Sequence, residues 1–206
     1  MKTIISIIIL GLVVIGVLMV SGGEKTMVSN IGDDTDVSSP VVEPEVPKVS
    51  GATDYKNTTY TIDGQMVQLV DGYAETESGL GSVAKVVTRY FGNELVTDLD
   101  GDGDDDVAFI LTQDSGGSGT FYYAVAALQT PEGYVGSDGY LLGDRIAPQS
   151  TNLSQNPRQV RVVVFNYADR AIGEPMTTSP SVGKGAYLKI VPETNTWAVV
   201  EPDFEG

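Results

Sequence analysis

The chain has 206 residues, of which 41% are hydrophobic and 19% are charged, a composition that suits one ordinary domain with additional segments. It contains no Cys and no His, which excludes disulfides, thiolate and imidazole metal ligands, and catalytic Ser-His or Cys-His pairs. The formal net charge of −16 argues against nucleic acids and anionic membrane surfaces as partners.

The first 22 residues form an apolar leader. Lys2 precedes eighteen uncharged residues, 3–20, which as a helix would span about 27 Å. This predicts an N-terminal hydrophobic helix that anchors the protein in a membrane. A cleavable signal peptide is the alternative, because residues 20–22 (Val-Ser-Gly) suit a signal peptidase. Either way, Lys2 predicts a cytoplasmic N-terminus with the remainder exported: a single-pass protein of the cell membrane, or a secreted one if 1–22 are removed.

Residues 23–54 have the composition of a tether. An acidic polar stretch, 32–36, is followed by Pro40, Pro44 and Pro47. Prolines at this spacing favour extended polyproline II conformation over any packed element. The segment is therefore expected to be disordered and to hold the following domain off the membrane.

From residue 55 to residue 206 almost every periodic segment is typical of a strand. Asp63-Gly64 between two alternating segments is the clearest hairpin signal. A short helix is an alternative for 82–90. The expected strands are 59–62, 65–70, 85–91, 107–113, 120–128, 140–142, 160–166, 187–191 and 197–201. These predict a mainly β fold, an antiparallel two-sheet sandwich or small open barrel, preceded by the one N-terminal hydrophobic helix.

Two of these strands should be central. Residues 107–113 and 120–128 are apolar on both faces and flank a Gly- and Ser-rich connection, 114–119. A strand that is apolar on both faces is buried on both faces, so the pair is expected in the middle of a sheet.

Residues 98–106 carry six carboxylates in nine positions. These charges would repel one another strongly without a counter-ion, and a hard cation relieves that repulsion. The spacing is that of a calcium loop, with side-chain ligands at positions one, three, five and nine, a backbone carbonyl at seven, and Gly103 at six for the sharp turn. The predicted Ca2+ ligands are Asp98, Asp100, Asp102, Asp104 and Asp106. The alternative is an acidic solvated turn that binds no ion.

The loop departs from one calcium-binding pattern. An EF-hand has Glu at position twelve, where this chain has Phe109 within an apolar, strand-like run. The loop is therefore expected to lead into a strand, and it resembles the calcium loops of integrin-type propeller blades and, less closely, those of dockerins. Those families carry several copies, whereas this chain has no internal repeat, so a propeller is not expected.

Three further sequence motifs show a resemblance to a second group of proteins. They are Gly143-Asp144-Arg145-Ile146-Ala147-Pro148-Gln149, Asn166-Tyr167-Ala168-Asp169-Arg170 and Gly173-Glu174-Pro175-Met176. Because of these motifs, residues 90–191 resemble a domain of uncharacterised exported bacterial proteins. The resemblance implies export and a common fold and brings no activity. The related loops have Asn at the position of Asp100, which is also an oxygen ligand.

Two Asp-Arg pairs, at 144–145 and 169–170, have no assigned role. In an extended chain adjacent side chains point apart, so each Arg is expected to meet a carboxylate elsewhere, with Glu174 one candidate. Structural ion pairing is one interpretation. The other is a recognition site in which Arg145 or Arg170 grips a carboxylate or sugar acid while Tyr167 or Tyr140 stacks on it.

Three classes of function remain open. The first is a cell-surface binding or envelope module, with an unknown surface ligand and a calcium loop that rigidifies the domain. The second is a hydrolase of glycans that uses two carboxylates from Asp114, Asp144, Asp169 and Glu174. The third is a structural spacer. Binding rather than catalysis is favoured, because the chain lacks His and Cys, the two side chains whose pKa values are most easily brought near neutral pH.

Overall fold

The computed structural model describes residues 53–78 and 84–202. The predicted N-terminal helix lies outside these residues, as does nearly all of the predicted tether. In the described part, no helix is long and apolar enough to cross a membrane.

One turn of 3-10 helix, η1 (Tyr55–Asn57), precedes the strands. The strands are β1 (Thr59–Ile62), β2 (Gln65–Gln68), β3 (Tyr73–Glu77), β4 (Lys85–Thr97), β5 (Asp106–Asp114), β6 (Phe121–Thr130), β7 (Gly133–Gly136), β8 (Tyr140–Asp144), β9 (Ala147–Leu153), β10 (Val163–Asp169), β11 (Val182–Val191) and β12 (Thr196–Val199).

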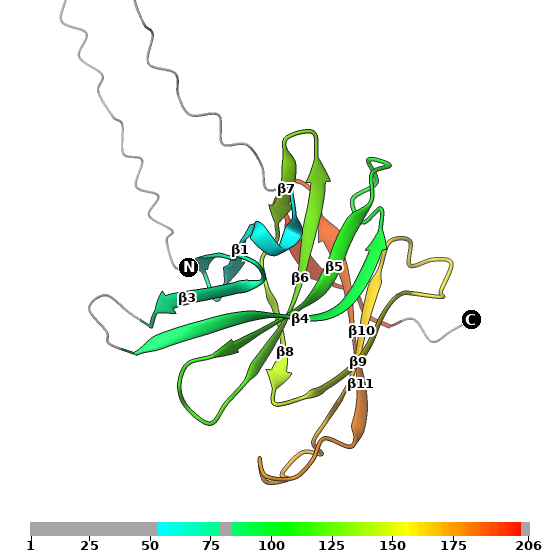
Figure 1. Cartoon of the computed structure of the whole chain (residues 1–206). Coiled ribbons are helices and arrows are strands. Elements are labelled where there is room, and N and C mark those ends of the chain that lie inside the picture. Colours follow the sequence, from blue (N-terminus) through cyan, green and yellow to red (C-terminus); the bar gives the residue numbers. More distant parts are fainter. Residues whose placement is uncertain (1–52, 79–83, 203–206) are drawn as a thin grey trace, which may run out of the picture. The chain divides into compact units, whose positions relative to one another are not determined.

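The described strands form antiparallel sheets (Figure 1). A six-stranded sheet has the order β3-β4-β5-β6-β7, and β8 pairs with the same edge of β6 as a continuation of β7. A four-stranded sheet has the order β12-β11-β10-β9, and β1 and β2 form a separate hairpin. The prediction of a mainly β domain with antiparallel sheets is confirmed.

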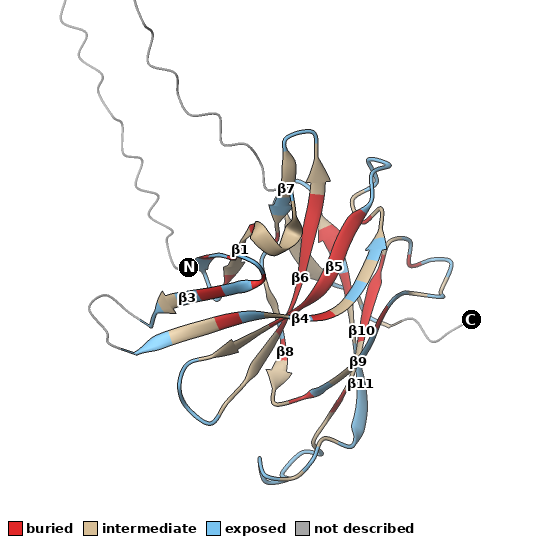
Figure 2. Cartoon of the chain, in the orientation of Figure 1, coloured by how far each residue is buried: buried red, intermediate tan, exposed pale blue. Residues whose placement is uncertain are grey.

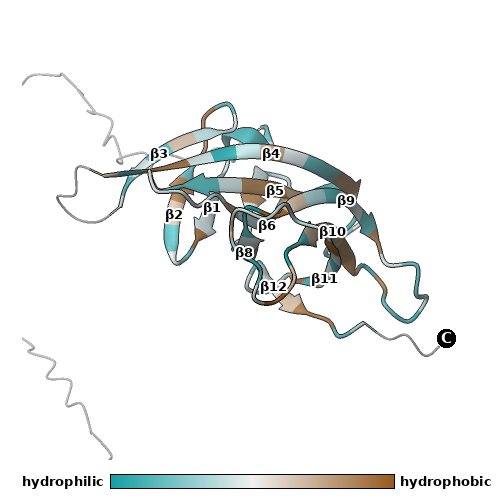
Figure 3. Ribbon diagram, turned by 90° about the horizontal axis from the view of Figure 1, so that it is seen from below, coloured by the Kyte–Doolittle hydropathy of each residue, from teal (hydrophilic) through white to brown (hydrophobic). Residues whose placement is uncertain are grey.

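The core lies on both faces of β5 and β6, which are the most buried strands in Figure 2. On one face, Ala108 and Ile110 pack with Val163 and Phe165 of the four-stranded sheet. On the other face, residues that alternate with these, Phe109 among them, pack with the β1–β2 hairpin and η1. Hydrophobic residues accordingly run along β5 in Figure 3. The prediction that this pair of strands is central is confirmed.

The β1–β2 hairpin follows from its turn. Asp63 and Gly64 have φ of 50° and 76°, the left-handed values that the two central residues of a type I′ hairpin turn require. The register then places Ile62 opposite Gln65. The hairpin was predicted at the observed position.

The expected strand over 85–91 is confirmed, and the alternative of a helix is not formed by residues 85–90. Other expectations need correction. Strand β4 continues to Thr97, because two bulges near Gly92 absorb extra residues without ending the pairing. No strand was expected between residues 142 and 160, but this segment contains β9, an edge strand that has Pro148 and few apolar residues. Strands β3 and β7 were also not predicted.

Candidate metal centre

The acidic loop connects β4 to β5 and is held by its own side chains. Asp98 Oδ1 accepts the Gly101 N–H at 2.5 Å, and Asp100 Oδ1 accepts the Asp102 N–H at 3.1 Å. Asp102 Oδ1 accepts the Asp104 N–H at 2.8 Å. Short side chains that accept a nearby backbone N–H in this way form tight turns, which explains why Asp alternates along the loop. In each of these three carboxylates the turn uses Oδ1, and Oδ2 takes no part in it.

Asp106 is the buried end of the loop. It is the first residue of β5 and has no exposed surface. Its Oδ2 accepts the Leu99 N–H and its Oδ1 the Gln129 N–H, both at 2.8 Å, so the carboxylate ties the loop to β6. Burial raises the pKa of Asp106, although these backbone N–H groups oppose the shift. A buried carboxylate with a raised pKa is stabilised in its charged form by a nearby cation.

Three of the predicted ligands come together. Asp98, Asp100 and Asp106 each have a carboxylate oxygen within 4.8 Å of those of the other two. Two oxygens that each lie about 2.4 Å from one Ca2+ ion are at most about 4.8 Å apart, so the spacing fits a shared hard cation.

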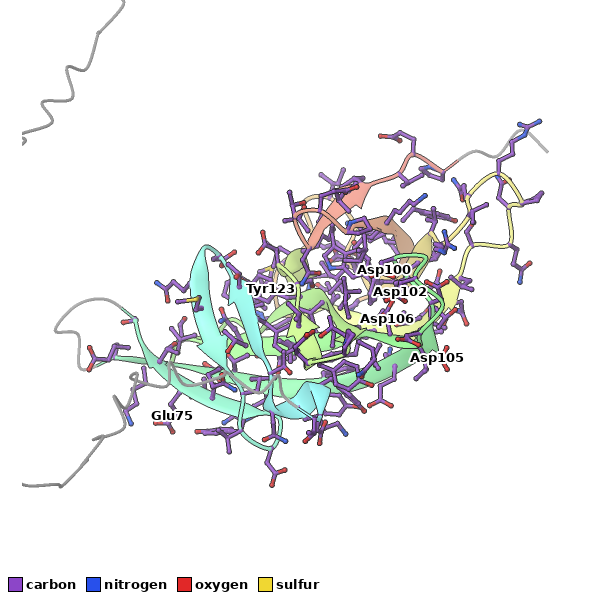
Figure 4. The ribbon with its side chains drawn as sticks, turned by 90° about the horizontal axis from the view of Figure 1, so that it is seen from above. Glu75, Asp100, Asp102, Asp105, Asp106 and Tyr123 are labelled. Atoms are coloured by element: carbon purple, nitrogen blue, oxygen red, sulfur yellow. The ribbon has the colours of Figure 1, made fainter. Side chains whose placement is uncertain are left out.

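The other two predicted ligands stand outside that group. Asp102 uses one oxygen for the turn at Asp104, and Asp104 is exposed. Figure 4 shows Asp100, Asp102 and Asp106 at this end of the domain, with Asp105 farther out. The described geometry therefore brings together three of the four predicted side-chain ligands, and Asp104 was predicted to contribute its backbone carbonyl.

Arg161 also lies at this site, although it was not among the predicted residues. Its Nη2 lies 3.5 Å from Asp98 Oδ2, across 63 positions of the chain. The guanidinium sits against Gly101, where a Cβ atom would lie 2.8 Å from Arg161 Cζ, and the φ of 100° at this position favours glycine. The site thus contains one cation of its own beside Asp98. No local pattern marks Arg161, because only the fold brings the two segments together.

The Asp-Arg pairs behave differently from the expectation. Arg145 pairs with its own neighbour, with Nη2 3.0 Å from Asp144 Oδ2, and Asp169 pairs with Lys184 at 2.7 Å. The expectation that adjacent side chains point apart was wrong for the first pair, because Arg145 has φ of 50° and the chain is not extended there. Glu174 meets neither Arg in the described structure. It accepts the backbone N–H of Ala171 at 2.9 Å.

The predicted ligand-binding residues are only partly brought together. Arg170 Nη1 donates to the Arg145 carbonyl at 3.0 Å, which places the two arginines side by side. Tyr167 instead packs against the core on the inner face of β10, and burial raises the pKa of its phenol. Both guanidinium groups are thus engaged by this chain's own oxygens.

The carboxylates considered for a hydrolase do not face one another across a described cleft. Asp144 binds Arg145, Asp169 binds Lys184, and Asp114 accepts the Gly116 N–H. None of them, nor Glu174, lines the described cavities beside Tyr123, Tyr187 or Trp197.

Comparisons with protein-family models, with curated proteins and with solved structures find no significant match to this chain.

Proposed function

We propose that this chain is an exported, membrane-tethered protein whose β domain binds Ca2+ through its acidic loop and serves as a cell-surface binding or envelope module. In this proposal residues 1–22 attach the protein to the membrane and 23–54 act as the tether. The domain is a sheet-on-sheet sandwich, with the hairpin of β1 and β2 covering the outer face of the larger sheet.

The observation that carries the calcium proposal is the convergence of Asp98, Asp100 and Asp106 within 4.8 Å. Three carboxylates at this separation repel one another, and the raised pKa of buried Asp106 reflects the cost of holding its charge there. A divalent cation with a preference for carboxylate oxygens relieves both costs. Backbone carbonyls of the loop, or water, would complete the six to eight oxygens that Ca2+ requires.

The structural role of the ion follows from the position of the ligands. Asp98 and Asp100 lie beyond the end of β4, and Asp106 begins β5 and binds the backbone of β6. An ion shared by these residues would fix the β4–β5 connection against the central strands. The ion would therefore stabilise the domain, and the unknown surface ligand would bind elsewhere, near Arg145 and Arg170 or on another face.

The test is thermal unfolding of the domain in Ca2+, in Mg2+ and in chelator. Ca2+ at a hundredfold excess over its Kd adds about 2.7 kcal/mol, which for a domain of this size raises Tm by about 5 to 10 °C. Asp100→Asn should abolish the increase because it removes a converging carboxylate. Asp105→Asn is the matched control: it removes one charge from the same loop at an exposed position outside the converging group, and should keep the increase.

Identical melting curves in Ca2+ and in chelator would show that the proposed calcium site is wrong. Loss of the increase in both variants would also contradict it, because the response would then depend on the charge of the loop and not on the three converging carboxylates.

A further inference from the structure

We propose that the outer face of the four-stranded sheet binds an uncharged carbohydrate. A cavity of about 400 Å3 opens there, over β9, β10 and β11. Its lining residues are Asn152, Leu153, Ser154, Gln155, Val164, Asn166 and Tyr187. The volume lies within the range of about 300 to 1,000 Å3 typical of small-molecule sites. The cavity is separate from the acidic loop, so the inference does not depend on calcium binding.

The register of the sheet creates this face. Val163 and Phe165 of β10 point into the core, so Val164 and Asn166 point outward. Tyr187 of β11 is paired with Val164, and Asn152 of β9 is paired with the same residue from the other side. Three neighbouring strands thus bring two amides and one phenol to a single patch.

The chemistry of the lining selects the class of ligand. No Asp, Glu, Lys or Arg lines the cavity, so it offers neither a counter-ion for a cation nor a grip for a carboxylate or phosphate. It offers amides, a hydroxyl and the phenol of Tyr187, all of which donate and accept hydrogen bonds, next to the ring of the same tyrosine and two aliphatic side chains. A sugar ring presents the matching surface, with hydroxyl groups at its edge and C–H groups on its faces.

The amides are already oriented. Asn152 Nδ2 and Asn166 Nδ2 both donate to Ser150 Oγ, at 2.8 and 3.2 Å. One hydroxyl therefore fixes both side chains while their Oδ1 atoms accept no hydrogen bond within the described residues. When a ligand donates hydrogen bonds to these oxygens, little conformational entropy of the two side chains is lost, which favours binding.

Gly185 lies beside three residues that line the cavity, Val164, Asn166 and Tyr187. It lies opposite Asn166 in the register, and a Cβ atom at this position would be 3.3 Å from Tyr187 Cε2 and 3.5 Å from Val164 Cγ1. Any larger side chain would fill the space between the amide of Asn166 and the tyrosine ring. Glycine at 185 thus keeps the ring accessible from the side of the amide.

The experiment is a titration of the 15N-labelled protein with four neutral probes, the methyl glycosides of glucose, mannose, galactose and N-acetylglucosamine, followed by NMR. At least one glycoside at millimolar concentration should shift the side-chain amide signals of Asn152 and Asn166. Tyr187→Ala and Asn166→Ala should each weaken that binding by about tenfold, the loss expected for one or two net contacts. Met66→Ala, an exposed substitution on the β1–β2 hairpin, is the control and should bind as the wild type does.

Gly185→Val provides a second variant that removes no hydrogen-bonding group and should abolish binding by filling the cavity. Its backbone pairing can be checked in the same spectra. The proposal is overturned if none of the four glycosides shifts the two amide signals, if glycerol shifts them equally, or if Gly185→Val binds like the wild type while folded. Binding should persist in chelator, so this result is independent of the calcium test.

Discussion

At the scale of single residues, Arg161 is the feature that most affects the proposed ion site. Its guanidinium lies 3.5 Å from Asp98 and is the cation that the protein itself supplies to the loop. A bound Ca2+ ion would compete with it for that carboxylate and would be repelled by its charge. Arg161 should therefore lower the calcium affinity of the wild-type protein while stabilising the loop when no ion is bound.

Arg161→Gln should consequently have opposite effects in the two states. Calcium should bind up to about fivefold more tightly, because an exposed ion pair is worth about 0.2 to 1 kcal/mol. In chelator the variant should melt at a slightly lower temperature than the wild type. Isothermal titration calorimetry and thermal unfolding measure the two effects. Lys189→Gln, which removes one exposed positive charge from β11, is the control, and equal or weaker calcium affinity in Arg161→Gln would contradict the prediction.

The ligands of this site differ in how far sequence could predict them. Asp98, Asp100 and Asp106 lie within nine residues, so the spacing of one short loop was enough. Arg161, in the connection between β9 and β10, and the backbone of Gln129, in β6, reach the site from distant parts of the chain, and no periodicity encodes such contacts. Asp102 has the spacing of a ligand and forms the same kind of turn as Asp98 and Asp100, yet its carboxylate lies outside the converging group, and a sequence pattern cannot distinguish these cases.

At the scale of elements, η1 is joined to β4 by an aromatic and ionic cluster. The phenols of Tyr55 and Tyr90 both donate to Glu94 Oε1, and Lys56 Nζ lies 4.1 Å from the centre of the Tyr90 ring. Burial, followed by the hydrogen bond to Glu94, raises the pKa of Tyr90 to about 12. The cluster thus holds the N-terminal turn of the described domain through protonated phenols.

This cluster predicts a loss of stability in alkali. Because the folded pKa of Tyr90 is raised, its contribution is fully present below the unfolded pKa of about 10 and is lost as pH rises toward and through 12. Tyr90→Phe should have a lower Tm than the wild type at pH 8, because it lacks the hydrogen bond to Glu94. Its Tm should also fall less than that of the wild type between pH 9 and pH 11. Thermal unfolding across this range measures both, and parallel curves for the two proteins would refute the prediction.

The strands show which elements the sequence could predict. The hairpin of β1 and β2 has a two-residue turn between alternating segments, and β5 and β6 are apolar on both faces, so each carries a signal in its own residues. Strand β9 carries none, because it is an edge strand with exposed polar residues and pairs on one side only, with β10. Pro148 is tolerated there for the same reason.

At the scale of the whole molecule, the proposed topology is testable on cells. An N-terminal anchor followed by an accessible tether predicts that protease added to intact cells releases a soluble fragment beginning near residue 50. The released fragment should resist further digestion, because its central strands are buried on both faces. Immunoblotting and N-terminal sequencing identify it. Recovery of the intact chain in the soluble cytoplasmic fraction would contradict export.

The order of the strands has a consequence for how this domain folds. Of the nine strand pairings in the described residues, eight join strands that follow one another in the chain, and only β6 with β8 skips one. Each pairing therefore closes a short loop, which lowers the contact order and speeds folding relative to most β proteins of this size. If the chain is exported in sequence order behind its N-terminal anchor, the larger sheet, from residues 73–144, can form before the strands of the smaller sheet have emerged. The smaller sheet would then form on a surface that already exists.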